Sequence, residues 1–233
     1  SKEWDGRGVE RIEFGMPSGR GVGPNANAAA YIDARLWAEF LGWYLSEGSC
    51  FEVANGGPRI SIRQTVRRAS LDRMMAALPW RSKWVDGEGY YICSRQLFGI
   101  LKPLGNRHEK RVPRWLLDSD AATLRAFWDA FVEGDGHKIK TGAVAIGLCN
   151  SGLRDDLQEV ASKLGLRSTA AEQRVKSGHM VYRLSAYAPH VSTIWDSKGN
   201  RYTEHYEGKV HCLTVEPSHT FLCRIEGRTF WTG

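Results

Sequence analysis

Two carboxylates occupy matching places after two similar stretches of sequence. Glu47 follows a stretch in which small residues stand at every fourth position, and Asp135 follows a second such stretch 88 residues further along. These small residues are Ala34, Ala38, Gly42 and Ser46 in the first stretch, and Ala122, Ala126, Ala130 and Gly134 in the second. A helix with such a stripe lets a second helix approach closer than the usual ~8–10 Å between axes. We expect the two stripes to face each other, which would bring Glu47 and Asp135 together.

A pair of apposed carboxylates suits metal chemistry. The two charges repel, so they are stable together when a cation lies between them. Ligands that offer only oxygen favour a hard cation such as Mg²⁺, other divalent cations being possible. A cation held in this way polarises a phosphoryl oxygen and lowers the pKa of water, so the chemistry that it indicates is hydrolysis of a phosphate ester.

Each stretch alone also fits an ordinary alanine-containing helix that ends at Glu-Gly or Asp-Gly. The register shared at four positions favours the paired carboxylates instead. An acid at a helix C-terminus also opposes the negative end of the macrodipole, and both Glu47 and Asp135 do so at matched positions.

The elements that would position these carboxylates follow one order twice. Hydrophobic spacing and turn residues predict a helix over 28–46, a hairpin over 49–66, a helix over 69–78, a hairpin over 80–94 and a short helix over 95–101. They then predict a helix over 121–133, a hairpin over 137–149, a helix over 153–165 and a hairpin over 170–186. We therefore expect an α+β fold with a duplicated, pseudo-twofold architecture.

The chain divides into three parts on this basis. Residues 1–27 hold Gly, Pro and Asn in irregular order and are interpreted as a linker. Residues 28–198 form the duplicated domain, with halves over 28–118 and 119–198. Residues 199–233 break the pattern with short β-rich segments and are expected to form a separate piece.

Charge and composition point to an anionic partner. The 233 residues carry 32 Lys and Arg against 26 Asp and Glu, a net charge of +6. Residues 59–114 alone carry a net charge of +9, so the basicity is concentrated. No apolar run approaches the roughly 18 residues of a membrane helix, and no signal-peptide pattern is present. The five cysteines show no zinc-ligand spacing. We expect a cytoplasmic, DNA-associated monomer with no membrane segment.

Two segments carry a resemblance to a known family. FLGWYLSEGS (40–49) and WDAFVEGDGH (128–137) resemble the paired motifs of the LAGLIDADG homing endonucleases, with Glu47 where Asp is commoner. Each motif is degenerate, and two of them, each followed by a hairpin and a helix, extend the resemblance over residues 28–195. The resemblance implies two αββαββα halves whose sheets straddle double-stranded DNA. It further implies a site-specific, Mg²⁺-dependent, staggered double-strand break in a long asymmetric site, with Glu47 and Asp135 as metal ligands.

Accessory catalytic groups follow from the same resemblance. Gln64, in ISIRQT, matches a Gln that orders water, and Lys110, in EKRVP, matches a basic residue beside the scissile phosphate. Asn150 stands near the second-half place corresponding to Gln64, and Lys198 or Arg201 loosely corresponds to Lys110. The alternatives are a surface strand residue for Gln64 and a solvated loop charge for Lys110.

Strand alternation indicates which residues would contact DNA. The candidates from the predicted strands and the segment after them are Arg59, Ser61, Arg63, Arg67, Arg68, Lys138, Lys140, Arg174 and Lys176. Arginine can pair with guanine through two hydrogen bonds, whereas lysine mostly neutralises phosphate. Such a set predicts DNA binding that weakens steeply with salt.

The last segment has a different resemblance. Residues 208–233 (GKVHCLTVEPSHTFLCRIEGRTFWTG) resemble part of an intein C-terminal splicing segment, which implies a Hint-like tail. His219 matches a histidine that assists terminal cyclisation, and Cys212 stands at a place where a subset of inteins uses Cys as nucleophile. Cys212 also fits a buried strand cysteine. Without a terminal Asn we expect no splicing.

Two other functions stay open at this level. The chain could be a non-cleaving DNA- or RNA-binding remnant of the maturase kind, or an intein fragment with an autoprocessing role. The presence of both acids and of a basic face favours the endonuclease.

Overall fold

The structure is a computed structural model that describes residues 4–15, 29–54, 57–139, 142–188, 205–209, 213, 215–216 and 220–232. Five residues named above lie outside the described residues, namely Lys140, Lys198, Arg201, Cys212 and His219. Their expected roles are therefore not addressed by the structure. None of the helices in the described ranges is long and apolar enough to cross a lipid bilayer.

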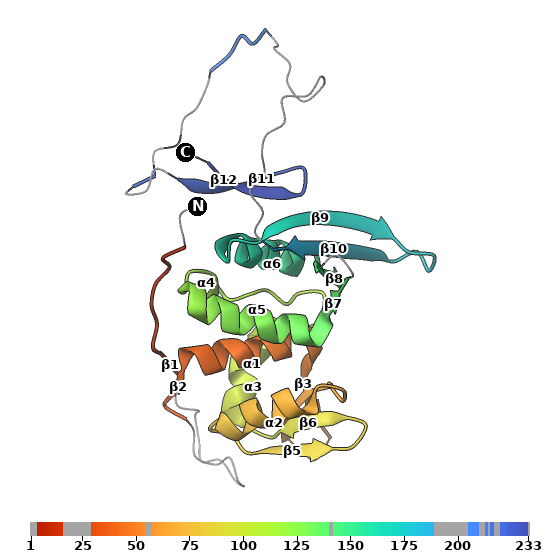
Figure 1. The fold of residues 1–233 in the computed structure, drawn as a ribbon. Helices are drawn as coiled ribbons and strands as arrows, with labels where there is room; N and C mark the ends of the chain where they lie inside the picture. The colour runs from red at the N-terminus through yellow and green to blue at the C-terminus, as the bar shows by residue number, and fades with distance from the viewer. Residues whose placement is uncertain are drawn as a thin grey trace.

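Two helices pack against each other at the centre of the molecule, α1 (Ala34–Glu47) and α5 (Ala121–Asp135) (Figure 1). Each begins at an aspartate whose carboxylate accepts a backbone hydrogen bond, from Leu36 to Asp33 at 2.9 Å and from Thr123 to Asp120 at 2.8 Å. Each ends at a glycine with an extended backbone that starts a strand. Both carboxylates of interest are thus the last residue of a central helix.

The first helix starts later than its sequence pattern predicts. Residues 31–33 form β2 (Tyr31–Asp33), which pairs antiparallel with β1 (Arg11–Glu13). The prediction of a helix from residue 28 is wrong here, because a strand from the expected linker takes up these residues. Such a pairing joins residues about 20 apart, which helical periodicity does not detect.

A four-stranded antiparallel sheet lies on the α1 side. Its strands, in the order β3-β4-β6-β5, are β3 (Gly48–Val53), β4 (Gly57–Ile62), β6 (Gly89–Ile92) and β5 (Ser82–Val85). Helices α2 (Arg68–Ala77) and α3 (Arg95–Leu101) pack against it, followed by the short 3₁₀ helix η1 (Lys102–Leu104). Ile60, Ile62 and Ile92 are at most 1% exposed and join the helices in one core.

A six-stranded antiparallel sheet lies on the α5 side. Its strands, in the order β11-β12-β9-β10-β8-β7, are β11 (Phe221–Ile225), β12 (Arg228–Thr232), β9 (Arg167–Arg174), β10 (Met180–Tyr187), β8 (Val144–Leu148) and β7 (Gly136–Lys138). Helix α6 (Ser151–Lys163) packs on one face, and α4 (Arg114–Leu117) precedes α5. The order helix, two strands, helix, two strands therefore occurs on both sides of the central helices.

The described tail hairpin is part of this sheet. Arg228 of β12 pairs with Thr169 of β9, and the Gln158 side chain on α6 donates to the carbonyl of Gly227 at 2.8 Å. The expectation of a separate piece from residue 199 does not hold for these residues.

The first and last described segments lie side by side (Figure 1). The Trp4 and Trp231 rings stack with centroids 6.1 Å apart, and the Trp4 indole donates to the Ser119 carbonyl at 2.8 Å. The Lys163 ammonium lies 4.1 Å from the centroid of the Trp4 ring. These contacts tie both segments to the second half of the chain.

Candidate active site

The close packing of α1 and α5 depends on two glycines. A Cβ on Gly42 would lie 2.5 Å from the Phe127 carbonyl oxygen and 2.7 Å from the Ala130 Cβ, and a Cβ on Gly134 would lie 2.3 Å from the Ser46 Oγ. No side chain fits at such distances, so the two small-residue stripes do face each other. Each contact pairs a residue with its counterpart 88 positions later, as in Gly42 with Ala130.

The second stripe is only partly an interface. Ala130 is 4% exposed, whereas Ala126 is half-buried and Ala122 is exposed. The prediction of four buried positions on α5 is therefore wrong at its N-terminal end. The close approach is found where Gly42 and Gly134 lie, near the ends that carry the carboxylates.

Glu47 and Asp135 line a single cleft of about 1010 Å³. Burial raises the pKa of Glu47 to about 7, and repulsion from Asp135 adds to that rise. The Asp135 side chain is exposed to the cleft, and the protein around its carboxyl raises its pKa to about 6. The Lys110 ammonium acts in the opposite direction on both pKa values. The two carboxyls are thus close enough to oppose each other's ionisation.

Gln64 lies beside the first carboxylate, two residues beyond β4. Its Nε2 donates to Glu47 Oε1 at 3.3 Å, and its Oε1 accepts from the Val66 backbone at 2.9 Å. Because Gln64 is only 9% exposed, the alternative of a surface strand residue is wrong. The amide is fixed at both ends and orients the Glu47 carboxylate.

Lys110 is buried, at 4% exposed, so the alternative of a solvated loop charge is wrong. Its Nζ donates to the carbonyls of Tyr44 and Gly48, each at 2.7 Å, and lies 4.6 Å from the centroid of the Tyr44 ring. Burial lowers the Lys110 pKa to about 8, and the nearby Asp135 and Glu47 carboxylates limit this fall. The ammonium therefore faces the end of α1 instead of projecting freely into the cleft.

Asn150 does not occupy a place equivalent to that of Gln64. Its Oδ1 accepts from the Leu153 backbone at 3.1 Å and caps α6, and its Nδ2 donates to the Lys110 carbonyl at 2.7 Å. The expectation that Asn150 acts as the second-half counterpart of Gln64 is corrected by these bonds, which use its amide within the protein.

The donor set fits a hard divalent cation. Mg²⁺ is commonly held by one or two carboxylates, with water and substrate phosphate completing the shell. A cation between Glu47 and Asp135 would relieve the repulsion that raises the Glu47 pKa. Within the described ranges no three His, Cys, Asp or Glu side chains converge on one point, so further ligands would be carbonyls, water or substrate.

Sequence reasoning missed part of the cleft. Lys102 and Arg107 line it together with the predicted Arg63. Both belong to the basic segment between the halves, where only Lys110 is singled out by resemblance. The local charge of residues 59–114 is the signal that contains them.

In the four-stranded sheet, register separates the candidate DNA contacts onto two faces. Arg59, Ser61 and Tyr91 share the face not covered by α2, where the Arg59 guanidinium lies 5.2 Å from the centroid of the Tyr91 ring. Ser61 is 1% exposed and hydrogen-bonded with Ser49 at 2.8 Å, so the prediction of a contact from its side chain is corrected.

Arg68 lies on the opposite, helix-covered face. Its guanidinium is 4.6 Å from the centroid of the Trp84 ring and 3.6 Å from Asp72 on its own helix. The grouping of Arg68 with the DNA-facing strand residues is therefore wrong. Arg63 and Arg67 are exposed, as expected.

The six-stranded sheet changes the second set of candidates. Lys138 pairs with Val144 and shares the helix-covered face, where its charge acts on Asp129 of α5, so its predicted orientation is wrong. His137 and Arg183 are on the uncovered face instead, and both are exposed. The missed signal is alternation counted from the strand's true start at residue 136.

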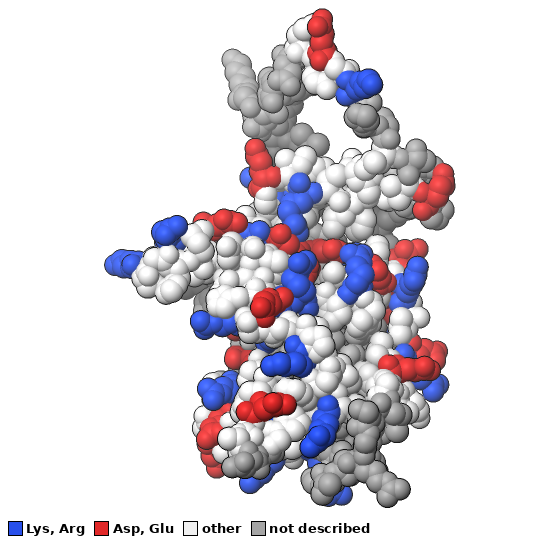
Figure 2. Space-filling view, turned by 180° about the vertical axis from the view of Figure 1, so that it is seen from behind, with Lys and Arg blue, Asp and Glu red and all other residues white. Residues whose placement is uncertain are grey.

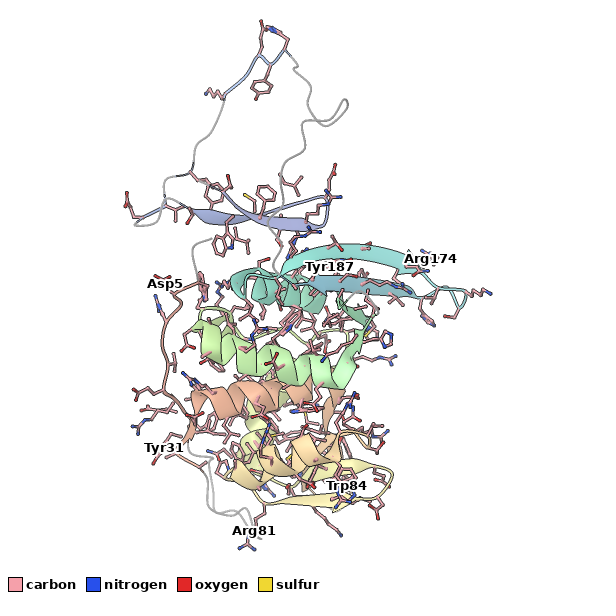
Figure 3. All side chains as sticks on the ribbon, in the orientation of Figure 1. Asp5, Tyr31, Arg81, Trp84, Arg174 and Tyr187 are labelled. Atoms are coloured by element: carbon pink, nitrogen blue, oxygen red, sulfur yellow. The ribbon has the colours of Figure 1, made fainter. Side chains whose placement is uncertain are left out.

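Arg174 and Lys176 lie at the tip of the β9–β10 hairpin. Both are exposed, and the Arg174 guanidinium donates to the Gly178 carbonyl at 3.4 Å. Figure 3 shows Arg174 and, on the other hairpin, Trp84 on the side of the molecule where α1 and α5 end. Tyr31 and Asp5 lie on the other side. On the face seen in Figure 2, basic and acidic side chains are interspersed.

Comparisons with known proteins gave similarity in structure alone. No protein-family model and no curated protein matches the chain. It is similar to solved structures of the homing endonuclease I-DmoI, namely mesophilic variants (17% identity, TM-score 0.49), a complex with DNA and Mn (19%, 0.49) and a variant with its target DNA in the presence of Mg (20%, 0.48). Each alignment covers 66% of this chain and 89% of the other.

Proposed function

We propose that this chain is a DNA endonuclease of the LAGLIDADG homing type, acting as a monomer. In this proposal two αββαββα halves related by a pseudo-twofold axis hold a long asymmetric site and make a staggered double-strand break. The observation that carries the proposal is the meeting of Glu47 and Asp135 at the ends of two closely packed helices, in a cleft that also holds cationic side chains.

The residues of the cleft have separate roles in this proposal. Glu47 and Asp135 hold the metal, and Gln64 fixes the rotation of the Glu47 carboxylate through its amide. A Mg²⁺ ion bound there would supply a water of lowered pKa and neutralise charge on the phosphate. Arg63, Lys102 and Arg107 line the cleft where a phosphate backbone would be neutralised.

DNA contacts come, in this proposal, from the sheet faces that the helices leave uncovered. Arg59 and Arg183 are the arginines suited to base edges there, and Arg174 and Lys176 at the hairpin tip suit phosphates. The two hairpins project on the side where α1 and α5 end, which supports a DNA duplex crossing both carboxylates (Figure 1).

The division of the chain is also a proposal. Residues 28–198 are taken as the nuclease, with halves over 28–118 and 119–198, residues 1–27 as a remnant of an upstream splicing region and residues 199–233 as part of an intein C-terminal segment. The resemblance of residues 208–233, with Cys212 and His219, supports an origin within an intein. A nuclease of this kind would act inside the cell, on DNA.

The test is metal-dependent cleavage of DNA. The protein is incubated with DNA from its source, including the host-gene junction rejoined without the insertion, and the ends are captured and sequenced. We expect staggered ends at one site with Mg²⁺ and none with EDTA. Sequence-specific binding without any metal-dependent cut would refute cleavage and favour the non-cleaving DNA- or RNA-binding function.

A further inference from the structure

The segment that joins the two halves is held from both sides. Lys110, Arg111 and Val112 follow one another between η1 and α4, and each is bonded to another element. The Lys110 side chain points into the first half, whereas the Lys110 carbonyl, the Arg111 side chain and the Val112 amide bond to residues of the second half.

On the first-half side, Lys110 closes the C-terminus of α1. The last carbonyls of a helix have no partner within it, and a cation there is favoured by the macrodipole. The ammonium donates to the Tyr44 and Gly48 carbonyls at 2.7 Å each and approaches that of Leu45 at 3.4 Å. Because Glu47 stands between Leu45 and Gly48, these bonds fix the backbone on both sides of the carboxylate.

On the second-half side, two buried residues near the start of α6 hold the same segment. Asn150, 6% exposed, donates to the Lys110 carbonyl at 2.7 Å. Asp156, 5% exposed, accepts two bonds from the Arg111 guanidinium, at 2.7 and 2.6 Å, and one from the Val112 amide at 2.9 Å. A carboxylate with three bonds in this geometry is rigidly placed.

We propose that Asn150 and Asp156 are positioning residues for catalysis, because they hold Lys110 against the end of α1 and so fix Glu47 opposite Asp135. The inference rests on the proposed function. In it, the second half sets the position of the first half's acid through one lysine, and the two acids are held in register by the segment that connects the halves.

A merely structural role is a poor explanation of this arrangement. The Gly48 amide already donates to the Tyr44 carbonyl and ends the helix without help. A buried ammonium is costly to desolvate, and an apolar residue of similar size is often as stable or more so. A placement fixed by buried polar groups is useful where a shift of about 1 Å would cost catalysis on the order of a hundredfold.

One substitution separates the two bonds of Asn150. Asn150→Ser keeps an oxygen that can cap α6, since Ser is a favoured N-cap, but it removes the amide that donates to Lys110. The matched control is Ser94→Ala, which removes the cap of α3, where the Leu97 amide donates to Ser94 Oγ at 3.2 Å. The control lowers stability by a similar route, and α3 does not contribute to the cleft.

Two measurements on the full chain test the inference without cleavage. Hydrogen exchange reports the opening of residues 44–50, and the free Mn²⁺ signal in electron paramagnetic resonance reports metal affinity. For Asn150→Ser we expect exchange of residues 44–50 to be about tenfold faster. We also expect Mn²⁺ affinity to fall several-fold, with unchanged DNA binding in EDTA. Ser94→Ala should change neither quantity.

The outcomes separate the two proposals. If Asn150→Ser matches Ser94→Ala in exchange at residues 44–50, the positioning role is refuted. If exchange rises while Mn²⁺ affinity stays at the wild-type value, the link to Glu47 as a ligand is refuted. If the wild-type protein and Glu47→Gln bind Mn²⁺ equally weakly, the proposed function fails, and exchange alone still decides whether Asn150 holds the end of α1.

Discussion

Glu47 and Asp135 each stand directly before a glycine that begins a strand, so each carboxylate is held at a junction of two elements. Replacing either carboxylate by its amide removes charge while keeping size and shape. We predict that Glu47→Gln and Asp135→Asn each lower the cleavage rate by at least about a thousandfold, since the loss of a metal ligand removes the reaction's main electrostatic support. Plasmid nicking and linearisation assays measure this loss.

DNA binding is the control for these variants. In EDTA, both variants should bind DNA at least as well as the wild-type protein, because each substitution removes negative charge from a cleft that would face phosphate. Full double-strand cutting by either variant would contradict the metal assignment.

The raised pKa values of the two carboxyls make stability depend on pH. The folded state holds the protons more tightly than the unfolded state, so folding is favoured at low pH and loses stability as pH rises through the folded pKa values of about 6 and about 7. We predict that the metal-free protein loses on the order of 1–2 kcal/mol of unfolding free energy between about pH 5 and pH 8. Urea unfolding at each pH measures it.

Glu47→Gln supplies the comparison, because it removes the group with the higher pKa and should flatten the pH profile. Mg²⁺ requires the ionised carboxylates, so its stabilising effect should be larger at the higher pH. A wild-type profile that rises over this range in the absence of metal would contradict the assignment.

At the residue level, sequence succeeded where the signal was local. The spacing of 88 identified Glu47 and Asp135, and the family motif placed Gln64 beside Glu47. The surroundings of Lys110 and Asn150 were not predictable in this way, because their bonds join residues 66 and 40 apart in sequence. Whether a lysine faces solvent or a helix end is decided by such distant contacts.

Among the elements, the crossing of α1 and α5 is the least tolerant of added volume. We predict that Gly42→Ala lowers unfolding free energy by about 3 kcal/mol, because its Cβ would meet the backbone of Phe127 and Phe131, which cannot move aside. Gly134→Ala should cost less, about 1–2 kcal/mol, since its Cβ would meet the Ser46 side chain. Denaturant unfolding with an unchanged slope measures both.

Gly99 provides the matched control within a helix. A Cβ there would have no atom within 4 Å, so Gly99→Ala should stabilise the protein by about 0.5–1 kcal/mol. If Gly42→Ala behaves like Gly99→Ala, the helices are farther apart than the structure has them.

The uncovered and helix-covered sheet faces predict different effects of arginine substitutions. Arg59→Ala and Arg183→Ala should each weaken DNA binding about tenfold and lower the slope of log affinity against log salt by about one. Arg68→Ala should leave both nearly unchanged, because its guanidinium lies beside Trp84 and Asp72. Fluorescence titration over a range of salt concentrations measures the slope, and equal effects from all three variants would contradict the assignment of faces.

The element order was more predictable than the element boundaries. Alternation and turn residues gave the hairpins and helices in their observed sequence, from residue 49 to residue 186. The start of α1 was missed because β2 pairs with β1, and the face of Lys138 was missed because register depends on where β7 begins. A shift of one residue in a strand exchanges its two faces.

At the scale of the whole molecule, the tail hairpin is held by one face only. Trp231 stacks on Trp4, and Thr229, two residues earlier on the same face, is hydrogen-bonded with Ser162 of α6 at 2.6 Å. Phe230 lies on the opposite face. We predict that Trp231→Ala lowers unfolding free energy by about 1–2 kcal/mol, whereas Phe230→Ala changes it by less than about 0.5 kcal/mol.

The comparison is well matched, because Trp231 and Phe230 are each 42% exposed. Thermal unfolding measures stability, and DNA cleavage should be unchanged in both variants, since neither residue lines the cleft. Equal destabilisation by the two substitutions would show that the hairpin does not dock through the Trp231 face.

The stacking of Trp4 on Trp231 also makes the fold portable. Two positions 227 residues apart meet at one place, so the chain leaves the molecule close to where it arrives. Another protein could accept residues 4–232 within a single surface loop without separating the two sides of that loop, as domain insertions require. The same geometry would permit a circularly permuted form, in which a short linker joins these two segments and new termini open in an exposed turn such as that around Gly178.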